Sequence, residues 1–208
     1  MRRRSVLGLA FGISLLVACG KKVRLKEIPP GQVVLAFGDS VTFGTGAVAG
    51  EDWPSLLAAK TGWRVVNAGI PGDTVESAKG RIKALLDEHH PALVIVEIGG
   101  NDFLRRRPQN VIKEDLRSIV QQVRLVGSQV VLIGVPELSL VAIVAGKPSD
   151  STIYRDLAED ENIALISNVF SDVLGHPELR ADKIHPNAAG YRQMADGILA
   201  RLKKLGLT

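Results

Sequence analysis

The sequence predicts a three-layer α/β domain built on a five-stranded parallel β-sheet. From residue 33 to the C-terminus, short runs rich in β-branched residues alternate with longer segments of helical periodicity. The short runs are continuously apolar rather than alternating, which indicates strands that are covered on both faces, as in a parallel sheet. A chain of 208 residues is long enough for one domain with its own core.

The apolar runs predict five strands, and helical patterns fill the intervals between them. The strands are expected at residues 33–37, 63–68, 92–99, 129–135 and 162–166. The helices are expected at residues 53–61, 75–89, 111–126, 150–161 and 187–205. The helix over 111–126 shows its apolar stripe most clearly, at Val111, Ile112, Leu116, Ile119, Val120, Val123 and Val126. In such a domain, ligands bind beyond the carboxyl ends of the strands.

The N-terminus has the pattern of an export signal. Three arginines, Arg2 to Arg4, precede an apolar segment from Val6 to Ala18, which is shorter than the roughly 20 residues that a membrane-spanning helix needs. We therefore expect a signal peptide over residues 1–18. The sequence LVAC that ends at Cys19 resembles the lipobox of bacterial lipoproteins, in which the cysteine is lipidated and becomes the new N-terminus. The alternative is an ordinary signal peptide with an incidental cysteine.

The lipoprotein interpretation sets further expectations. Residues 19–31 are charged and end in prolines, which is typical of a tether, so the folded domain is expected to cover residues 32–208. We expect a lipid-anchored protein of the bacterial cell envelope that faces the periplasm or the exterior. Gly20 after Cys19 favours an outer membrane, by resemblance to lipoprotein sorting signals.

Charge and cysteine content exclude several classes of function. Of the 26 basic residues, three belong to the signal, which leaves 23 against 22 acidic residues. Such a nearly equal number of basic and acidic residues gives no indication of nucleic-acid binding. Cys19 is the only cysteine of the chain, so no intramolecular disulfide can form. No spacing of metal ligands and no phosphate-binding glycine motif is present, and we expect no metal or other cofactor and a monomeric protein.

Polar residues gather at the predicted strand ends and before the last helix. The four segments are GDS at Gly38, NAGIPGDT at Asn67, GGND at Gly99 and DKIHP at Asp182. Taken singly, the first and third are most simply turns, and the last is most simply a helix start with Pro186 in its first turn.

Together, the four segments suit nucleophilic catalysis. A serine hydroxyl needs a base, and the base needs a third group to hold it. Ser40 can be the nucleophile and His185 the base, while Asp182 lies three residues earlier and can share a face with His185 in a tight turn. Gly72, which lacks a Cβ and is expected to open a helix, can donate its N–H group to a developing oxyanion, together with Asn101 and the amide of Ser40.

The segments FGDSVTFG, NAGIPGDT, IGGND and DKIHPN resemble, in order, the four sequence blocks of the SGNH (GDSL-type) hydrolases, especially the bacterial thioesterase, lysophospholipase and arylesterase branch. The resemblance runs from about Val33 to the C-terminal helix, and departs from the motif only in Val41, where leucine is usual. It implies a flavodoxin-like α/β/α fold, a catalytic triad of Ser40, His185 and Asp182, and an oxyanion hole of Ser40, Gly72 and Asn101.

The segment after the fourth predicted strand bears on the substrate class. This segment is unusually apolar, and it predicts an acyl-binding wall made of Leu138, Leu140, Val141, Ile143 and Val144. A short buried helix is the alternative. We expect an acyl ester, thioester or lysophospholipid as substrate. A carbohydrate O-acetylesterase would use the same triad in a shallow polar cleft, and a non-catalytic surface lipoprotein would be expected to have lost these polar residues.

Overall fold

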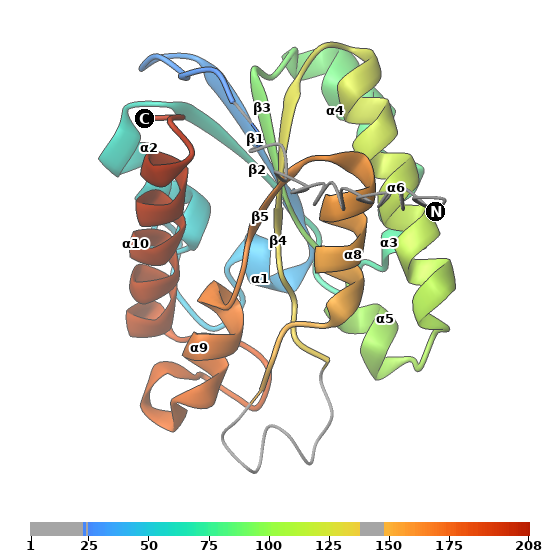
Figure 1. Ribbon diagram of the computed structural model, residues 1–208. Coiled ribbons are helices and arrows are strands. Elements are labelled where there is room, and N and C mark those ends of the chain that lie inside the picture. The colour runs from blue at the N-terminus through green and yellow to red at the C-terminus, as the bar shows by residue number, and fades with distance from the viewer. Residues whose placement is uncertain (1–22, 24, 138–147) are drawn as a thin grey trace, which may run out of the picture.

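Five parallel strands form a single sheet in the order β2-β1-β3-β4-β5 (Figure 1). The structure, a computed structural model, describes Val23 and residues 25–137 and 148–208. The strands are β1 (Val33–Gly38), β2 (Arg64–Gly69), β3 (Leu93–Glu97), β4 (Gln129–Ile133) and β5 (Ala164–Ile166). Each lies within two residues of its predicted bounds, so the predicted five-stranded parallel sheet is confirmed.

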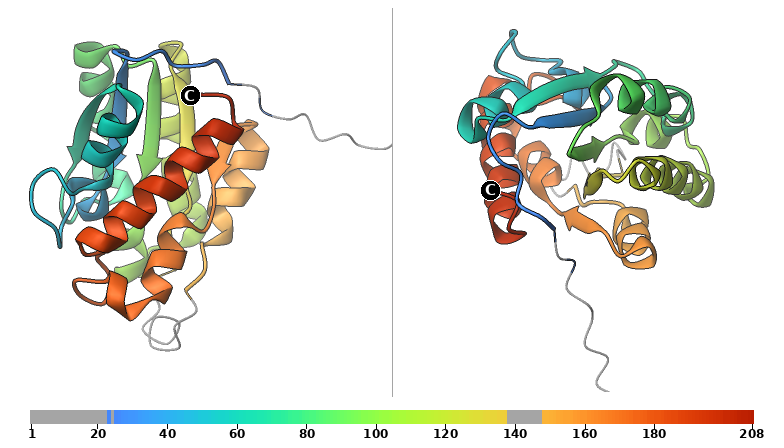
Figure 2. Two further views of the ribbon diagram at one scale, coloured as in Figure 1. Left: turned by 90° about the vertical axis from the view of Figure 1, so that its left-hand side faces the viewer. Right: turned by 90° about the horizontal axis from the view of Figure 1, so that it is seen from above.

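Helices cover both faces of the sheet and make the predicted three layers (Figures 1 and 2). One layer contains α2 (Trp53–Thr61), α9 (Val169–Gly175) and α10 (Ala188–Lys204), in which α10 packs against both of the others. The other contains α3 (Val75–Lys79), α4 (Ile82–His89), α6 (Gln109–Leu125) and α8 (Thr152–Glu161), with α6 in contact with the other three. The described part of the chain also has α1 (Ser40–Phe43), α5 (Gly100–Leu104) and a 3₁₀ helix, Pro177–Leu179.

The helix predicted over 75–89 is two helices, and that prediction is wrong in this respect. The chain breaks at Gly80, which is the C-cap residue of α3, and at Arg81, which makes long-range contacts. The Arg81 guanidinium donates to the carbonyl oxygens of Gly38 (2.9 Å) and Ala68 (2.9 Å) at the ends of β1 and β2. It also lies 4.3 Å from the centre of the Phe37 ring. These contacts hold Arg81 against the ends of the two strands.

The α6 helix illustrates how the core holds the layers together. Its residues Ile112, Leu116, Ile119, Val120 and Val123 are fully buried, whereas the predicted stripe is exposed at its two ends, Val111 and Val126. Each buried side chain of this size contributes about 1.5–3 kcal/mol relative to an exposed one. The helix is therefore fixed mainly by its apolar face.

The N-terminal segment packs onto the domain earlier than predicted. Ile28 is buried, its N–H donates to the Leu207 carbonyl (2.9 Å), and its own carbonyl accepts from the Trp63 indole (2.7 Å). The predicted tether, 19–31, therefore overlaps the folded body at its C-terminal part. The predicted signal peptide and Cys19 lie outside the described residues. None of the helices in the described part of the chain is long and apolar enough to cross a membrane.

The strand order defines where a site is expected. The chain passes from β1 to β2 on one side and then returns to β3 on the other side of β1. In sheets of this order, ligands bind at the crevice where the order reverses, beyond the carboxyl ends of the two central strands. Gly38 of β1 and Glu97 of β3 are register partners, so the segments that follow them leave the sheet side by side.

Candidate active site

Ser40 is the first residue of α1 and lies directly beyond the end of β1. Asp39 caps this short helix, because its Oδ1 accepts the N–H of Val41 (3.0 Å). The preceding Gly38 has no room for a side chain: a Cβ there would lie 2.2 Å from the Glu97 carbonyl oxygen. Close packing of β1 against β3 and the Asp39 cap therefore fix the position of Ser40.

The loop before α10 brings His185 to Ser40. Asp182 Oδ1 accepts the N–H groups of Ile184 (2.8 Å) and His185 (2.8 Å), which closes a tight turn. Asp182 Oδ2 lies 2.7 Å from His185 Nδ1, and His185 Nε2 lies 3.0 Å from Ser40 Oγ. An ionised carboxylate only accepts hydrogen bonds, so Nδ1 carries the proton and Nε2 is left to accept from the Ser40 hydroxyl.

Electrostatics favour the ionised form of Asp182. Partial burial by itself raises the pKa of this carboxyl, but hydrogen bonds from the His185 ring and from the N–H groups of Ile184 and His185 outweigh it, so the pKa is lowered overall. The carboxylate therefore keeps its charge opposite the imidazole.

Asn101 lies in the first turn of α5, beyond the end of β3. Its Nδ2 donates to the Asp73 carbonyl (3.0 Å) and lies 3.4 Å from Asp39 Oδ2. Asn101, Ser40 and His185 line the same pocket. The structure thus brings together three of the residues singled out in the sequence, and Asp182 reaches the group through His185.

Gly72 is placed differently from the expectation. It was expected to open a helix, but α3 begins after the cap residue Thr74, so Gly72 lies in the preceding loop. Its φ of +82° explains why glycine is needed there, because other residues rarely adopt this conformation. Gly72 does not line the pocket, but its neighbour Asp73 accepts the hydrogen bond from Asn101.

The pocket has an apolar wall that sequence reasoning did not identify. Its apolar lining residues are Val41, Leu104, Val135, Phe170 and Ile184. Positions next to the polar blocks could have indicated two of them, since Val41 follows the serine and Ile184 precedes the histidine. The predicted acyl wall, Leu138, Leu140, Val141, Ile143 and Val144, lies outside the described residues.

Two buried carboxyl groups lie at the base of the pocket, and sequence reasoning did not identify them either. Burial raises the pKa of Asp39 to about 6, although the Val41 N–H and the positive charge of protonated His185 act against this rise. Burial and the negative charge of Asp39 raise the pKa of Glu97 well above its ordinary value. Glu97 Oε2 lies 2.8 Å from Thr42 Oγ1, and Oε1 is buried without a hydrogen-bond partner among the residues that the structure describes.

A neutral Glu97 accounts for this arrangement. Thr42 Oγ1 lies near both the Glu97 carboxyl (2.8 Å) and the Glu97 carbonyl oxygen (3.4 Å), but it has only one proton to donate. If the carboxyl is protonated, it donates to Thr42, and Thr42 donates to the carbonyl. The signal in the sequence was the single acidic residue at the end of an otherwise apolar strand.

Across the part of the chain that the structure describes, the His, Cys, Asp and Glu side chains form no group of three that could hold a metal ion. What the geometry presents is a hydroxyl, an imidazole and a carboxylate in hydrogen-bonded sequence next to an amide donor and an apolar wall.

Comparisons with known proteins agree on one family. Residues 36–193 match the model of the GDSL-like lipase/acylhydrolase family. The chain is 34% identical to the esterase TesA of Pseudomonas aeruginosa, over 92% of this chain and 98% of that protein. It is also 34% identical to thioesterase 1/protease 1/lysophospholipase L1 of Escherichia coli, over 83% and 84% of the two chains. A crystal structure of TesA superposes with a TM-score of 0.74 at 33% identity, covering 84% of this chain and 99% of that one.

Proposed function

Since this chain belongs to the GDSL-like lipase/acylhydrolase family and is a carboxylic ester hydrolase, we propose that it cleaves acyl esters through a triad of Ser40, His185 and Asp182. The observation that carries the proposal is the continuous hydrogen-bonded path from Asp182 Oδ2 to His185 (2.7 Å) and from His185 Nε2 to Ser40 Oγ (3.0 Å). Both distances lie within the reach that proton transfer needs.

In the first step, Ser40 Oγ attacks the acyl carbon while its proton passes to His185 Nε2. The tetrahedral intermediate collapses when His185 returns that proton to the leaving oxygen, or to the sulfur of a thioester, and the acyl group remains on Ser40. Water then attacks the acyl-enzyme, its proton passes to His185, and the acid leaves as Ser40 regains its proton. Asp182 stabilises the imidazolium that forms in both steps.

The oxyanion that forms in each step needs N–H donors, and we assign this role to Asn101, Gly72 and the amide of Ser40. Asn101 already uses one N–H on the Asp73 carbonyl at 3.0 Å. Its contact with Asp39 is 3.4 Å, longer than a good hydrogen bond, so the second N–H can turn to an oxyanion in the pocket. One such donor contributes roughly 10²–10³-fold to kcat.

The apolar wall supports an acyl chain as the group that enters the pocket. Phe170 and Val135 are buried side chains that present carbon to this space, and Leu104 is partly exposed at its edge. We therefore propose a lysophospholipid, thioester or other ester with an apolar acyl group as substrate, and place O-acetylated carbohydrate second.

Initial rates on p-nitrophenyl esters from acetyl to palmitoyl test this proposal. We expect a maximum at medium or long chains, and a loss of turnover by at least about 10³-fold in Ser40→Ala. Activity on the acetyl ester alone would move the assignment to a deacetylase. Unchanged turnover in Ser40→Ala would remove the mechanism.

We also propose that the protein is exported and anchored through lipid on Cys19, as its N-terminal sequence predicts. Metabolic labelling with radioactive palmitate checks this directly. The label is expected on the wild-type protein and not on Cys19→Ser, and equal labelling of the two would contradict the proposal.

A further inference from the structure

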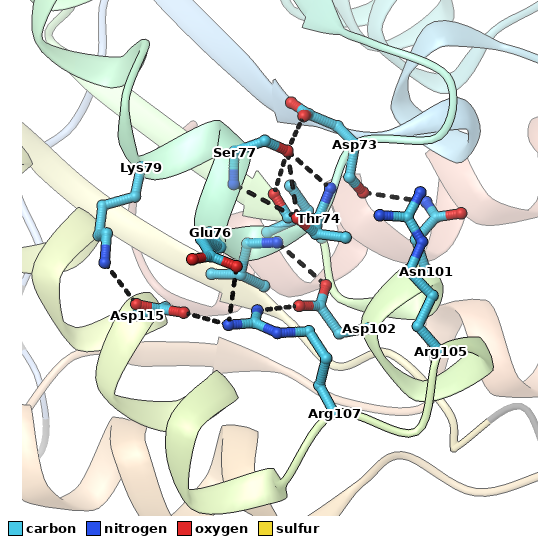
Figure 3. A network of polar contacts seen from close by, with 12 residues as sticks. Asp73, Thr74, Glu76, Ser77, Lys79, Asn101, Asp102, Arg105, Arg107 and Asp115 are labelled. Atoms are coloured by element: carbon cyan, nitrogen blue, oxygen red, sulfur yellow. Dashed lines mark hydrogen bonds and ion pairs between the residues drawn. The ribbon is translucent and has the colours of Figure 1, made fainter.

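Helix α5 and its cap residue hold the loop before α3 at three places (Figure 3). Asn101 Nδ2 donates to the Asp73 carbonyl (3.0 Å), and the Arg105 guanidinium donates to the Gly72 carbonyl (3.2 Å). Asp102 Oδ2 accepts the N–H of the first residue of α3, Val75 (3.0 Å). The loop that carries Gly72 is therefore attached to the helix that carries Asn101.

Asp102 is the buried centre of this attachment. Its side chain is 0% exposed, and its second oxygen accepts from the guanidinium of Arg107. Arg107 Nη2 also donates to Asp115 of α6 (2.9 Å) and lies 3.3 Å from Glu76 of α3. One arginine thus joins α3, α5 and α6 around a single buried carboxylate.

The outer edge of the network is closed by Lys79. Its ammonium lies 2.6 Å from Asp115 Oδ1. Burial raises the pKa of Asp115, but the hydrogen bonds from Lys79 and Arg107 outweigh it and lower the pKa overall. Asp115 therefore stays charged. Lys79 shares this partner with Arg107, and it has no bond to Asp102 or to the loop that carries Gly72 in the network drawn (Figure 3).

The backbone after α5 is bent to bring Arg107 over Asp102. Arg106 adopts a φ of +54°, which is unusual for a residue with a side chain, and the Arg107 N–H donates to the Asp102 carbonyl (3.0 Å). A strained conformation of this kind persists only where surrounding contacts hold it. Buried ion pairs are also poor sources of net stability compared with apolar packing, so their best-supported benefit is to fix one arrangement.

We propose that Asp102 and Arg107 are positioning residues, which lock the 72–75 loop onto α5 and so set Gly72 and Asn101 at the distances that an oxyanion on the Ser40 side requires. This inference rests on the proposed function. Neither residue touches the substrate. They act through the Val75 N–H and through the helix that presents Asn101.

The test compares two variants of the network with a matched control in the purified protein. Arg107→Lys keeps the charge but loses the fork that reaches three carboxylates, and Asp102→Asn keeps the shape but loses the charge. Lys79→Gln breaks an ion pair of the same network away from the loop. We expect kcat to fall about 10–100-fold in the first two with KM changed less than threefold, because small misplacements of catalytic groups cost up to about 10² in rate. For Lys79→Gln we expect less than a twofold change.

Coupling to Asn101 distinguishes positioning from general loss of structure. In an Asn101→Ala background, Arg107→Lys and Asp102→Asn are expected to lower kcat by a smaller factor than in the wild type, since one of the two donors that they position is gone and only Gly72 is left to misplace. An equal fold-loss in both backgrounds, or a loss matched by Lys79→Gln, would overturn the inference. If Arg107→Lys does not fold, Asp102→Asn, which is isosteric, decides the question alone.

The experiments distinguish a failure of this inference from a failure of the proposed function. Full turnover by Ser40→Ala would refute the triad. Inactive Ser40→Ala together with kcat within twofold of wild type in both network variants would leave the triad intact and refute only the positioning role.

Discussion

Replacing Asp39 by asparagine should make the protein more stable at neutral pH and have much less effect at acidic pH. Burial holds the pKa of Asp39 at about 6, against 3.8 for the ordinary carboxyl. The folded protein therefore keeps this proton to higher pH than the unfolded chain does. Stability from this group is fully present below pH 3.8 and is lost as the pH rises through about 6.

The size of the effect follows from the shift in pKa. A difference of about 2 pH units corresponds to about 3 kcal/mol once both states are ionised, at 1.36 kcal/mol per unit. Between pH 4.5 and 7.5, about 2 kcal/mol of this cost develops. Asparagine does not titrate, so Asp39→Asn lacks this cost. The negative charge of Asp39 also helps to raise the pKa of Glu97. Removing this charge lowers the pKa of Glu97 and so reduces the cost of ionising Glu97 in the folded protein, which acts in the same direction.

Urea unfolding of wild type and Asp39→Asn at pH 4.5 and 7.5 measures this effect. The quantity of interest is the variant-minus-wild-type difference in unfolding free energy. In this difference, the titration of groups that are not coupled to Asp39 cancels, and comparing the two pH values removes the pH-independent effect of the substitution. This difference should rise by about 2 kcal/mol toward pH 7.5. Asp87→Asn, on the exposed face of α4, controls for the amide substitution. A rise below about 0.5 kcal/mol would refute the reasoning.

Three further predictions follow from single contacts. Asp182→Asn places an amide NH₂ against the imidazole Nδ1–H and should lower kcat roughly 10²–10⁴-fold without loss of fold, measured by esterase rates beside circular dichroism. Glu97→Gln introduces a neutral isostere that can still bond Thr42, so it should lower the free energy of unfolding by less than about 1 kcal/mol at pH 6, whereas Glu97→Ala should lower it by more than about 2 kcal/mol. Equal losses in urea unfolding would contradict the assignment of Glu97 as a neutral acid. Gly99→Ala would place a Cβ 2.2 Å from the Tyr154 hydroxyl at a φ of +133°, so thermal unfolding should show a loss of at least about 2 kcal/mol.

The sheet was predictable because its signal is local. Continuous apolar runs such as Val33 to Phe37 are typical of strands that are covered on both faces, and the found strand differs from the predicted one by a single residue. The break between α3 and α4 was missed. Gly80 is a local helix-end signal, but the carbonyl groups that bind Arg81 belong to two distant strands, which the local sequence does not show.

The same distinction applies to the candidate site. His185 and Asp182 are three residues apart, and Ser40 follows a strand end, so their meeting follows from spacing and topology. Glu97 and Asp102 were missed because their importance depends on burial and on partners far away in the chain. The positive φ of Gly72 explains why glycine occupies this position. That Gly72 lies before the cap residue of α3, rather than in the helix, depends on backbone geometry that the sequence does not show.

The most direct test of the central claim is covalent labelling of the nucleophile. Diethyl p-nitrophenyl phosphate transfers its phosphoryl group to an activated serine and releases p-nitrophenol, and mass spectrometry of peptides locates the adduct. We predict one adduct per chain, on Ser40, which is absent in Ser40→Ala and formed at least about 10²-fold more slowly in His185→Ala. An adduct on another residue, or equal labelling of Ser40→Ala, would contradict the assignment of Ser40 as the nucleophile.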